Sequence, residues 1–434
     1  MTDPSTSPSP TAPKGAAARL LGLWFGTALW KRILLALVLG VAAGLVLQDR
    51  AADIKWMGDA FVRLIRMLVV PLIFVTIVAG VAAMAEPRRL GAIGVKTIGL
   101  YFGLMLVASA LGLLIGTILQ PGLGVDLSAA VPIVAGAPPP SFGETLMNII
   151  PLNPIAAMGS GDVLAVIFFA LLVGVGILVV GEAAAPLRKV FDAGSAVMLQ
   201  ITYFVMEMAP FGVFALIAWV TGTSGPAAFV SVFKLALCVV IGCTIQTLLV
   251  HGGLIRLLAR LPARPFFRDV TDAVVVAFTT SSSSATLPAA MRVAQRNLGV
   301  SPMVASTTLP IGVTLSMDGT ALYVALLAMF SAQVFGIDLT AADYLMVVLT
   351  TTLVAIGTAP VPSASLFILA AVLSVIGINA EQTALIVGFI LPFDRPLDMM
   401  RTVPNCTSDL SVAVVVARSE GELDEPSYLA RPVE

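Results

Sequence analysis

A group of polar residues in an otherwise apolar segment is the first sign of chemistry in this sequence. The segment, residues 384–416, is long enough to cross a bilayer, and its polar residues are separated by four, three, four and four positions. On an α-helix this spacing places them on one face. They are Asp394, Asp398, Arg401, Asn405 and Asp409. Because ionisable side chains are unfavourable at membrane depth, the stripe predicts a site for a polar or charged molecule that enters the membrane.

A simpler interpretation of the same residues is a structural ion pair. Asp398 and Arg401 are three positions apart and can neutralise each other on one helix. That pair alone leaves Asp394, Asn405 and Asp409 without a reason to lie in an apolar segment. We therefore favour a binding site, with the isolated pair as the alternative.

The composition places the stripe in a polytopic membrane protein. Of the 434 residues, 58% are hydrophobic and 11% are charged, whereas soluble domains carry about 25% charged residues. The long apolar runs predict helices as the spanning elements. The formal net charge of −1 gives no sign of a nucleic-acid partner. The three cysteines show no metal-binding or disulfide spacing and are interpreted as packing residues.

Basic residues between the apolar runs predict the topology. Six runs occur near residues 33–48, 56–84, 97–119, 145–180, 191–220 and 227–258. Lys and Arg accumulate at alternate connections, whereas loops 120–143 and 221–226 contain neither. The positive-inside rule then places both the N-terminus and the basic connections in the cytoplasm. A seventh segment around Asp318 and an eighth with the polar stripe complete the expected set, and the C-terminus is also cytoplasmic.

Two apolar segments in the second half are interrupted by polar tips. Residues 273–278 and 285–294 flank a serine run, and basic residues at both ends place this pair on the cytoplasmic side. Residues 344–356 and 366–376 flank the tip 357–365, with acidic neighbours that suit the outer side. Neither segment has arms that span about 30 Å of hydrocarbon. We expect two re-entrant helical hairpins, each followed by a broken spanning helix, as inverted repeats around a binding site.

Three other interpretations remain open at this point. The serine run is also consistent with a polar cytoplasmic loop. An intramembrane serine protease would need Ser224 and His251 within about 3 Å, but 27 positions separate them, about 40 Å along a helix. We therefore expect His251 to be a polar packing residue at the end of the sixth span, and its removal to leave uptake intact. A channel is the third interpretation, which saturable, gradient-driven uptake would distinguish from a carrier.

Four ordered motifs then make the sequence recognisable. They lie at residues 281–288, 317–323, 356–359 and 398–402, the last followed by Asn405 and Asp409. Together they resemble the dicarboxylate/amino acid:cation symporters, the glutamate transporter family, over about residues 30–420. The resemblance implies a prokaryotic-type symporter, not an enzyme, with an all-α membrane fold of eight transmembrane helices plus two re-entrant hairpins. It also implies a homotrimer in the lipid of the cell membrane and no organic cofactor.

The resemblance divides the chain into a static scaffold and a transport domain that carries substrate across as a unit, in the manner of an elevator. The expected parts are a disordered cytoplasmic N-terminus (1–30), scaffold helices 1 and 2 (31–90), transport-domain helix 3 (91–121), scaffold helices 4 and 5 (142–222), the remaining transport domain with helix 6, both hairpins and helices 7 and 8 (227–418), and a solvated cytoplasmic tail (419–434).

The motif positions imply which residues contact substrate. Arg401, helped by Thr320, resembles the clamp on a side-chain carboxylate, which suits a planar guanidinium. Asp398 resembles the residue that takes the amino group. Asn405 and the backbone around Ser283 resemble the contacts to the α-carboxylate. The other implied contacts are Ser282, Thr402, and Val361 and Ser365 in a gate at the second tip.

Arg401 together with Asp398 favours an acidic amino acid, aspartate or glutamate, as the substrate. An unpaired carboxylate would repel a C4-dicarboxylate in a low dielectric, because that substrate brings no ammonium. The predicted function is sodium-driven uptake of aspartate or glutamate. Proton-coupled symport of glutamate, aspartate or a C4-dicarboxylate is the alternative, and the intramembrane protease is a remote one.

Two sodium sites follow from the resemblance, since sodium prefers hard oxygen ligands. The first combines Asp409 with carbonyl groups of Gly312, Ser316 and Asn405. The second uses carbonyl groups of Thr314, Met317, Ala355, Ile356 and Thr358.

A third sodium site is expected to be degraded. Tyr101 and Asp318 remain, but Ser316 replaces an asparagine of the family pattern, and Leu104 and Met105 supply no oxygen. We therefore expect at most two sodium ions. A proton on Asp318 is the alternative third ion, because burial disfavours an uncompensated carboxylate.

Overall fold

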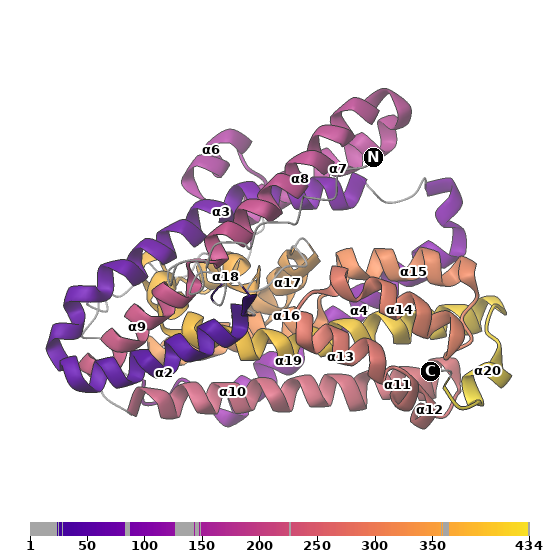
Figure 1. Cartoon of the computed structure of the whole chain (residues 1–434). Helices are drawn as coiled ribbons and strands as arrows, with labels where there is room; N and C mark the ends of the chain where they lie inside the picture. The colour runs from indigo at the N-terminus through magenta and orange to yellow at the C-terminus, as the bar shows by residue number, and fades with distance from the viewer. Residues whose placement is uncertain are drawn as a thin grey trace, which may run out of the picture.

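The computed structural model describes residues 24, 26, 27, 29–82, 87–125, 143, 147, 149–224, 227–356, 358 and 364–432. Within this part of the chain every regular element is a helix (Figure 1), which confirms the all-α expectation. Most of the N-terminus that was expected to be disordered, residues 1–30, lies outside the described residues.

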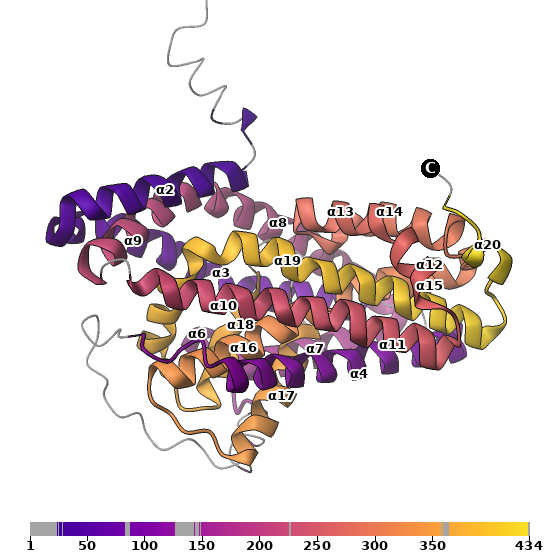
Figure 2. The same ribbon diagram turned by 90° about the horizontal axis from the view of Figure 1, so that it is seen from below.

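The helices pack into two groups that adjoin each other (Figures 1 and 2). The group around α3, called the α3 group here, contains α2 (Leu29–Leu47), η1 (Gln48–Ile54), α3 (Lys55–Ala82), α6 (Pro154–Ser160), α7 (Val163–Val180), η2 (Gly181–Ala184), α8 (Ala185–Met206) and α9 (Ala209–Ser224).

The α19 group contains α4 and all helices after α9. Its members are α4 (Pro87–Leu119), α10 (Ala227–Ile245), η3 (Gln246–His251), α11 (Gly252–Leu254), η4 (Ile255–Ala259), α12 (Ala263–Asp269), α13 (Thr271–Thr280), α14 (Ser283–Arg296), α15 (Pro302–Leu315), α16 (Asp318–Val334), α17 (Ala341–Ile356), α18 (Ala364–Ser374), α19 (Ala380–Glu420) and α20 (Glu425–Leu429). The elements η3 and η4 are π-helical turns. Such turns frequently occur at functional sites.

Five helical stretches of the described residues are long and apolar enough to cross a membrane. They are Lys31–Ala82, Ile93–Leu119, Val163–Met206, Val232–Ala259 and Pro302–Val334. The chain is therefore a helical membrane protein. The apolar run at 191–220, which was expected to be one span, is divided between α8 and α9, so that prediction was wrong in its boundaries. The division falls where Glu207 accepts two hydrogen bonds from Arg32, at 2.6 and 3.0 Å.

The serine run lies between α13 and α14, which pack against each other as a helical hairpin. Ser281 adopts a left-handed conformation with φ +52°, and the Ser282 side chain accepts a hydrogen bond from the backbone of Ala285 at 3.3 Å. The run is therefore a tight turn between two packed helices, with Ser281 and Ser283 buried and Ser284 exposed.

A second pair, α17 and α18, packs in the same way. Its tip falls mostly outside the described residues, and so does the expected contact residue Val361. Thr358 is described and buried, and its hydroxyl donates to the carbonyl oxygen of Val354 at 3.1 Å. The pair begins its return at Ala364, next to Ser365 of the expected site.

The expected break in the seventh segment is confirmed, but the expected break in the eighth was wrong. α15 ends at Leu315 and α16 begins at Asp318. By contrast, α19 is one helix of 41 residues that includes Pro404. A side chain of the intact α19 reaches the break between α15 and α16: Asn405 accepts the backbone N–H of Gly319 at 2.8 Å. The stripe on α19 thus satisfies broken backbone on a neighbouring helix without a break in α19 itself.

The tail after α19 was expected to be solvated, and most of its described residues are exposed, with Tyr428 as the exception. Tyr428 on α20 is fully buried and donates its hydroxyl to the carbonyl oxygen of Pro262 at 2.8 Å. The backbone of Ser301 donates to the carbonyl of Glu422 at 3.1 Å. One aromatic ring and these paired backbone groups fix the tail to the base of the α13–α14 hairpin.

Gly319 permits the closest approach between α16 and α19. A Cβ atom at this position would overlap the carbonyl oxygen of Arg401, which belongs to rigid backbone. We expect Gly319→Ala to lower the melting temperature of the purified protein and to reduce uptake. Gly103→Ala is the matched control, because its Cβ would meet no atom within 4 Å, and it should leave both unchanged. Equal stability of the two variants would contradict the close approach.

Candidate substrate and ion sites

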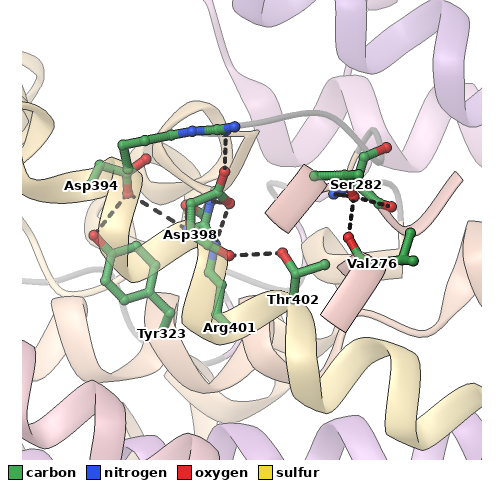
Figure 3. Close-up of polar contacts among 10 residues, drawn as sticks. Val276, Ser282, Tyr323, Asp394, Asp398, Arg401 and Thr402 are labelled. Atoms are coloured by element: carbon green, nitrogen blue, oxygen red, sulfur yellow. Dashed lines mark hydrogen bonds and ion pairs between the residues drawn. The ribbon is translucent and has the colours of Figure 1, made fainter. Parts of the chain in front are cut away.

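Arg401 lies at the centre of a buried polar cluster on α19 (Figure 3). Its Nε and Nη2 both donate to Oδ1 of Asp398, at 2.9 and 2.5 Å. Nη1 donates to the hydroxyl of Ser365 and lies 3.7 Å from an oxygen of Asp394. The guanidinium carbon is 4.8 Å from the ring centroid of Tyr323. Every donor nitrogen of Arg401 therefore has a partner within the protein.

The structure contains the Asp398–Arg401 pair of the simpler interpretation, but the pair is not isolated. Tyr323 donates its hydroxyl to Asp394 at 3.0 Å, and Arg395 donates to the second oxygen of Asp398 at 3.3 Å. Two guanidinium groups thus balance two carboxylates, and none of these four side chains is more than 10% exposed. Removal of one partner would leave an uncompensated charge in a low dielectric.

Arg395 was missed by the sequence reasoning. It is three positions before Asp398, a spacing that allows contact on a helix and that was available in the sequence. Arg395 directly follows Asp394, so it falls outside the spacing of four and three positions that defines the stripe.

The other expected substrate residues are only partly brought together. Thr320 is buried on the first turn of α16. Thr402 donates its hydroxyl to the carbonyl oxygen of Asp398 at 2.7 Å, within its own helix. Asn405 is engaged by Gly319 and donates to the sulfur of Met317 at 3.4 Å. Asn405 therefore fixes the start of α16, whereas Ser365 lies directly against Arg401.

Two cavities adjoin the hairpin tips. One of about 350 Å³ is lined by Thr280, Ser282 and Ala285 of the first tip and by Arg395. Another of about 310 Å³ is lined by Ser284 of the first tip and by Thr358 of the second. A charged cluster beside hollows at the tips is the arrangement that a binding site for a small polar molecule needs.

The residues of the expected second sodium site border the smaller cavity. Thr314, Ile356 and Thr358 line it. Met317 and Ala355 pack together in one small apolar cluster, against which Ile356 also packs. The break between α15 and α16 and the end of α17 therefore meet here. Helix ends leave carbonyl groups without helical partners, which are the ligands that a hard cation prefers.

Asp409 of the first expected sodium site lies in a buried setting close to Gly312 and Tyr101. Its carboxylate is 3% exposed, and Oδ1 has no hydrogen-bond partner among the described residues. A Cβ atom at Gly312 would overlap both this oxygen and the Tyr101 hydroxyl, so the three groups converge. Ser316 donates to, or accepts from, Ser408 at 3.0 Å. A buried carboxylate oxygen without a donor fits a cation better than it fits an apolar core.

The third expected sodium site keeps Tyr101 and Asp318 but gains no side-chain oxygen from Leu104 or Met105, and Oδ1 of Asp318 has no hydrogen-bond partner among the described residues. Met105 is buried and packs with Met317 in an apolar cluster. The Tyr101 hydroxyl donates to the carbonyl of Thr308 at 3.2 Å. Asp318 instead receives nitrogen contacts at Oδ2, from Gln246 at 3.1 Å and from His251 at 3.0 Å.

His251 is buried near the end of the sixth span, as expected of a polar packing residue, but it also contacts an expected ion-site residue. The residue is fully buried within the π-helical turn η3 and contacts Asp318 through Nε2 and Thr407 through Nδ1, the latter at 2.9 Å. Distance along the sequence hid this contact, because Asp318 is 67 positions away. His251 is therefore a partner of an expected ion-site residue, and its removal is no longer expected to be silent.

An apolar helical protein with a buried charge cluster between two helical hairpins, and with cavities at their tips, has the features of a membrane carrier. The chain belongs to the sodium:dicarboxylate symporter family, whose sequence pattern matches residues 29–419. It is accordingly a transporter and not an enzyme, which confirms the resemblance drawn from the four motifs.

Curated relatives extend over nearly the whole chain. The proton/glutamate-aspartate symporter of Bacillus subtilis (strain 168) is 34% identical over 92% of this chain and 96% of its own. The protein of the same description in Escherichia coli (strain K12) is 34% identical over 92% and 94%. A C4-dicarboxylate transport protein of Anaeromyxobacter sp. (strain K) is 32% identical over 92% and 91%.

Proposed function

We propose that the protein is a symporter for aspartate or glutamate. The observation that carries this proposal is the buried contact of Arg401 with Asp398 beside the tip residue Ser365. An acidic amino acid brings one ammonium and two carboxylates. Its side-chain carboxylate would replace Asp398 on Arg401, and its ammonium would compensate the released Asp398. The exchange keeps each buried charge paired.

A C4-dicarboxylate suits the same residues less well. It has no ammonium, so Asp398 would stay paired with Arg401 or would face a second carboxylate. Relatives of both descriptions match the chain to similar extents, so overall similarity does not decide between the substrates. The presence of Asp398 in the cluster favours the amino acid.

Sodium is the proposed driving ion, with two sites. Asp409 with Gly312, Ser316 and Asn405 forms the first, and the unpartnered carboxylate oxygen of Asp409 supports it. The second lies at Thr314, Met317, Ala355, Ile356 and Thr358, beside the smaller cavity. A proton is the competing ion, since relatives are described as proton/glutamate-aspartate and proton/sodium-glutamate symporters.

The proposed architecture has eight transmembrane helices and two re-entrant hairpins related as inverted repeats. The α3 group would be the scaffold of a homotrimer in the cell membrane, with both termini of the chain in the cytoplasm. The α19 group would be the domain that moves as an elevator. The separate packing of the two groups, with α4 on the side of α19 despite its early place in the sequence, supports this division.

Counterflow in reconstituted vesicles tests the proposal. Vesicles loaded with unlabelled aspartate should accumulate labelled aspartate in sodium but not in choline, whereas succinate and serine should compete weakly. Exchange that is as strong with succinate as with aspartate would establish the C4-dicarboxylate alternative. Full uptake on a pH gradient without sodium would overturn the sodium assignment and establish the proton alternative. The absence of exchange with every acidic substrate would refute the proposal as a whole.

Substitution of His251 should weaken uptake. His251→Leu removes one of two nitrogen contacts to the buried Asp318. Loss of a hydrogen-bond partner by a buried charged group costs about 1.5–3 kcal/mol, so we expect roughly a tenfold to hundredfold loss in uptake efficiency. Thr244→Val is the matched control on α10, because its hydroxyl bonds only the carbonyl of Val240 on an exposed face. The measurement is the initial uptake rate of each variant at equal protein density. Equal rates for His251→Leu and wild type would contradict this role of the contact.

A further inference from the structure

Arg395 differs from Arg401 in how its donors are used. Every donor nitrogen of Arg401 has a partner, whereas Nε of Arg395 is buried and has no hydrogen-bond partner among the described residues. In the described part of the chain Arg395 forms one hydrogen bond, to Asp398 at 3.3 Å, which is longer than the bonds made by Arg401. A buried guanidinium with an unused donor is uncommon, because such groups are normally fully bonded.

Arg395 also lines the larger cavity, of about 350 Å³, opposite the first hairpin tip. Thr280, Ser282 and Ala285 of that tip line the same space. Its side chain is 10% exposed, so a guest in this cavity would meet a largely desolvated positive charge. Charge-assisted bonds are strongest under these conditions.

The first tip contributes a second attraction for an anion. α14 is a helix of 14 residues that begins at Ser283, directly after its cap residue Ser282. The N–H groups of a first helical turn lack helical acceptors and carry partial positive charge, which favours a carboxylate. Arg395 and the start of α14 therefore both present positive charge to the same cavity.

Other charges around this cavity do not oppose an anion. Glu207 is the only acidic residue that lines it among the described residues, and Arg32 holds its carboxylate through two bonds, at 2.6 and 3.0 Å. Asp398 lies behind Arg395 and is shared with Arg401. The remaining lining residues are uncharged.

We propose that Arg395 binds the α-carboxylate of the substrate, between α19 and the start of α14. This inference rests on the proposed function and assigns a second guanidinium to it. Two arginines then face two carboxylates, while Asp398, which contacts both arginines, faces the ammonium. The pattern of two positive charges and one negative charge is the complement of an acidic amino acid.

Two ligands that differ by one group make the proposal testable. Aspartate carries two carboxylates, and β-alanine is aspartate without its α-carboxylate. In counterflow of labelled aspartate by wild-type protein, the KM for aspartate and the inhibition constant of β-alanine give a reference ratio. Arg395→Gln should raise the KM for aspartate by about a hundredfold, since a buried charged partner is lost. The inhibition constant of β-alanine should change by less than about threefold. The ratio of this inhibition constant to the KM for aspartate should therefore fall steeply.

A conservative variant and a control complete the experiment. Arg395→Lys keeps the charge but loses the planar fork, so we expect an intermediate rise of about tenfold for aspartate with β-alanine again unchanged. If Arg395→Gln does not fold, Arg395→Lys decides on the same ratio. Arg292→Gln is the matched control, because that arginine is exposed and contacts only Asp272, at 3.5 Å.

The outcomes separate this inference from the proposed function. An unchanged KM for aspartate in the Arg395 variants, or an equal weakening of aspartate and β-alanine, would overturn the role of Arg395 and would leave aspartate transport standing. An equal weakening would mean that Arg395 supports the site only through structure. Wild-type protein that exchanges no acidic amino acid would instead overturn the proposed function itself.

Discussion

Arg401→Ala should abolish the uptake of aspartate and glutamate. The substitution removes the guanidinium that contacts Asp398, Ser365 and, at 3.7 Å, Asp394. Truncation of one partner of a buried charge pair costs about 2–5 kcal/mol, which corresponds to roughly a thirtyfold to several-thousandfold loss. We expect the upper part of this range, because the same group would also bind the substrate side chain.

The control for this experiment is a second arginine in a simple pair. Arg188 is half-exposed on α8 and faces Asp192 one turn later at 3.9 Å, so Arg188→Ala should retain wild-type uptake. Both variants are compared in reconstituted vesicles at equal protein density, with size-exclusion profiles as the check of folding. A well-folded Arg401→Ala protein with intact uptake would place the substrate pocket elsewhere.

Asp409→Asn should weaken the response to sodium. The change preserves shape and removes the charge of a carboxylate that is buried, with one oxygen lacking a donor in the described part of the chain. If that oxygen is a cation ligand, its neutralisation costs about 1.5–3 kcal/mol, so half-maximal uptake should need roughly tenfold to hundredfold more sodium. The affinity for aspartate at saturating sodium should change much less.

The measurement is a sodium titration of initial uptake rates at fixed aspartate. Asp272→Asn is the matched control, since that carboxylate is exposed and contacts only Arg292. An Asp409→Asn protein with an unaltered sodium curve would remove the first sodium site from the proposal. A variant that loses sodium dependence but keeps uptake on a pH gradient would favour proton coupling.

The elements of the site were predictable where the signal is local. The stripe on α19 follows from spacing along one helix, and the serine turn between α13 and α14 follows from polar residues between two short apolar arms. The break before Asp318 was predictable for the same reason. Each of these depends on residues close together in the sequence, so periodicity and interruption suffice.

Contacts between distant segments were not predictable in this way. Asp318 meets His251 and Gln246 only because η3 packs against α19 and places both side chains toward the start of α16. The continuity of α19 was missed for a related reason. Its polar side chains find partners on α16, and a single sequence does not show that those partners are in reach.

Arg395 illustrates a third limit. Its spacing to Asp398 was readable, but the cavity that its side chain lines depends on the position of the α13–α14 tip. Residue types identify which groups can pair. Only the fold shows which of these groups are already paired and which have a donor without an acceptor.

The packed C-terminal tail bears on how the protein is handled in the laboratory. Arg268 donates to the carbonyl oxygen of Ala430, and Lys96 in the first half of α4 contacts Glu420 at 2.6 Å. An affinity tag fused directly after Glu434 would therefore begin only a few residues beyond an anchored segment. A flexible spacer, or a tag at the opposite end of the chain, is the safer choice for purification. Deletion of α20 would expose the apolar surface that Tyr428 now covers and would promote aggregation.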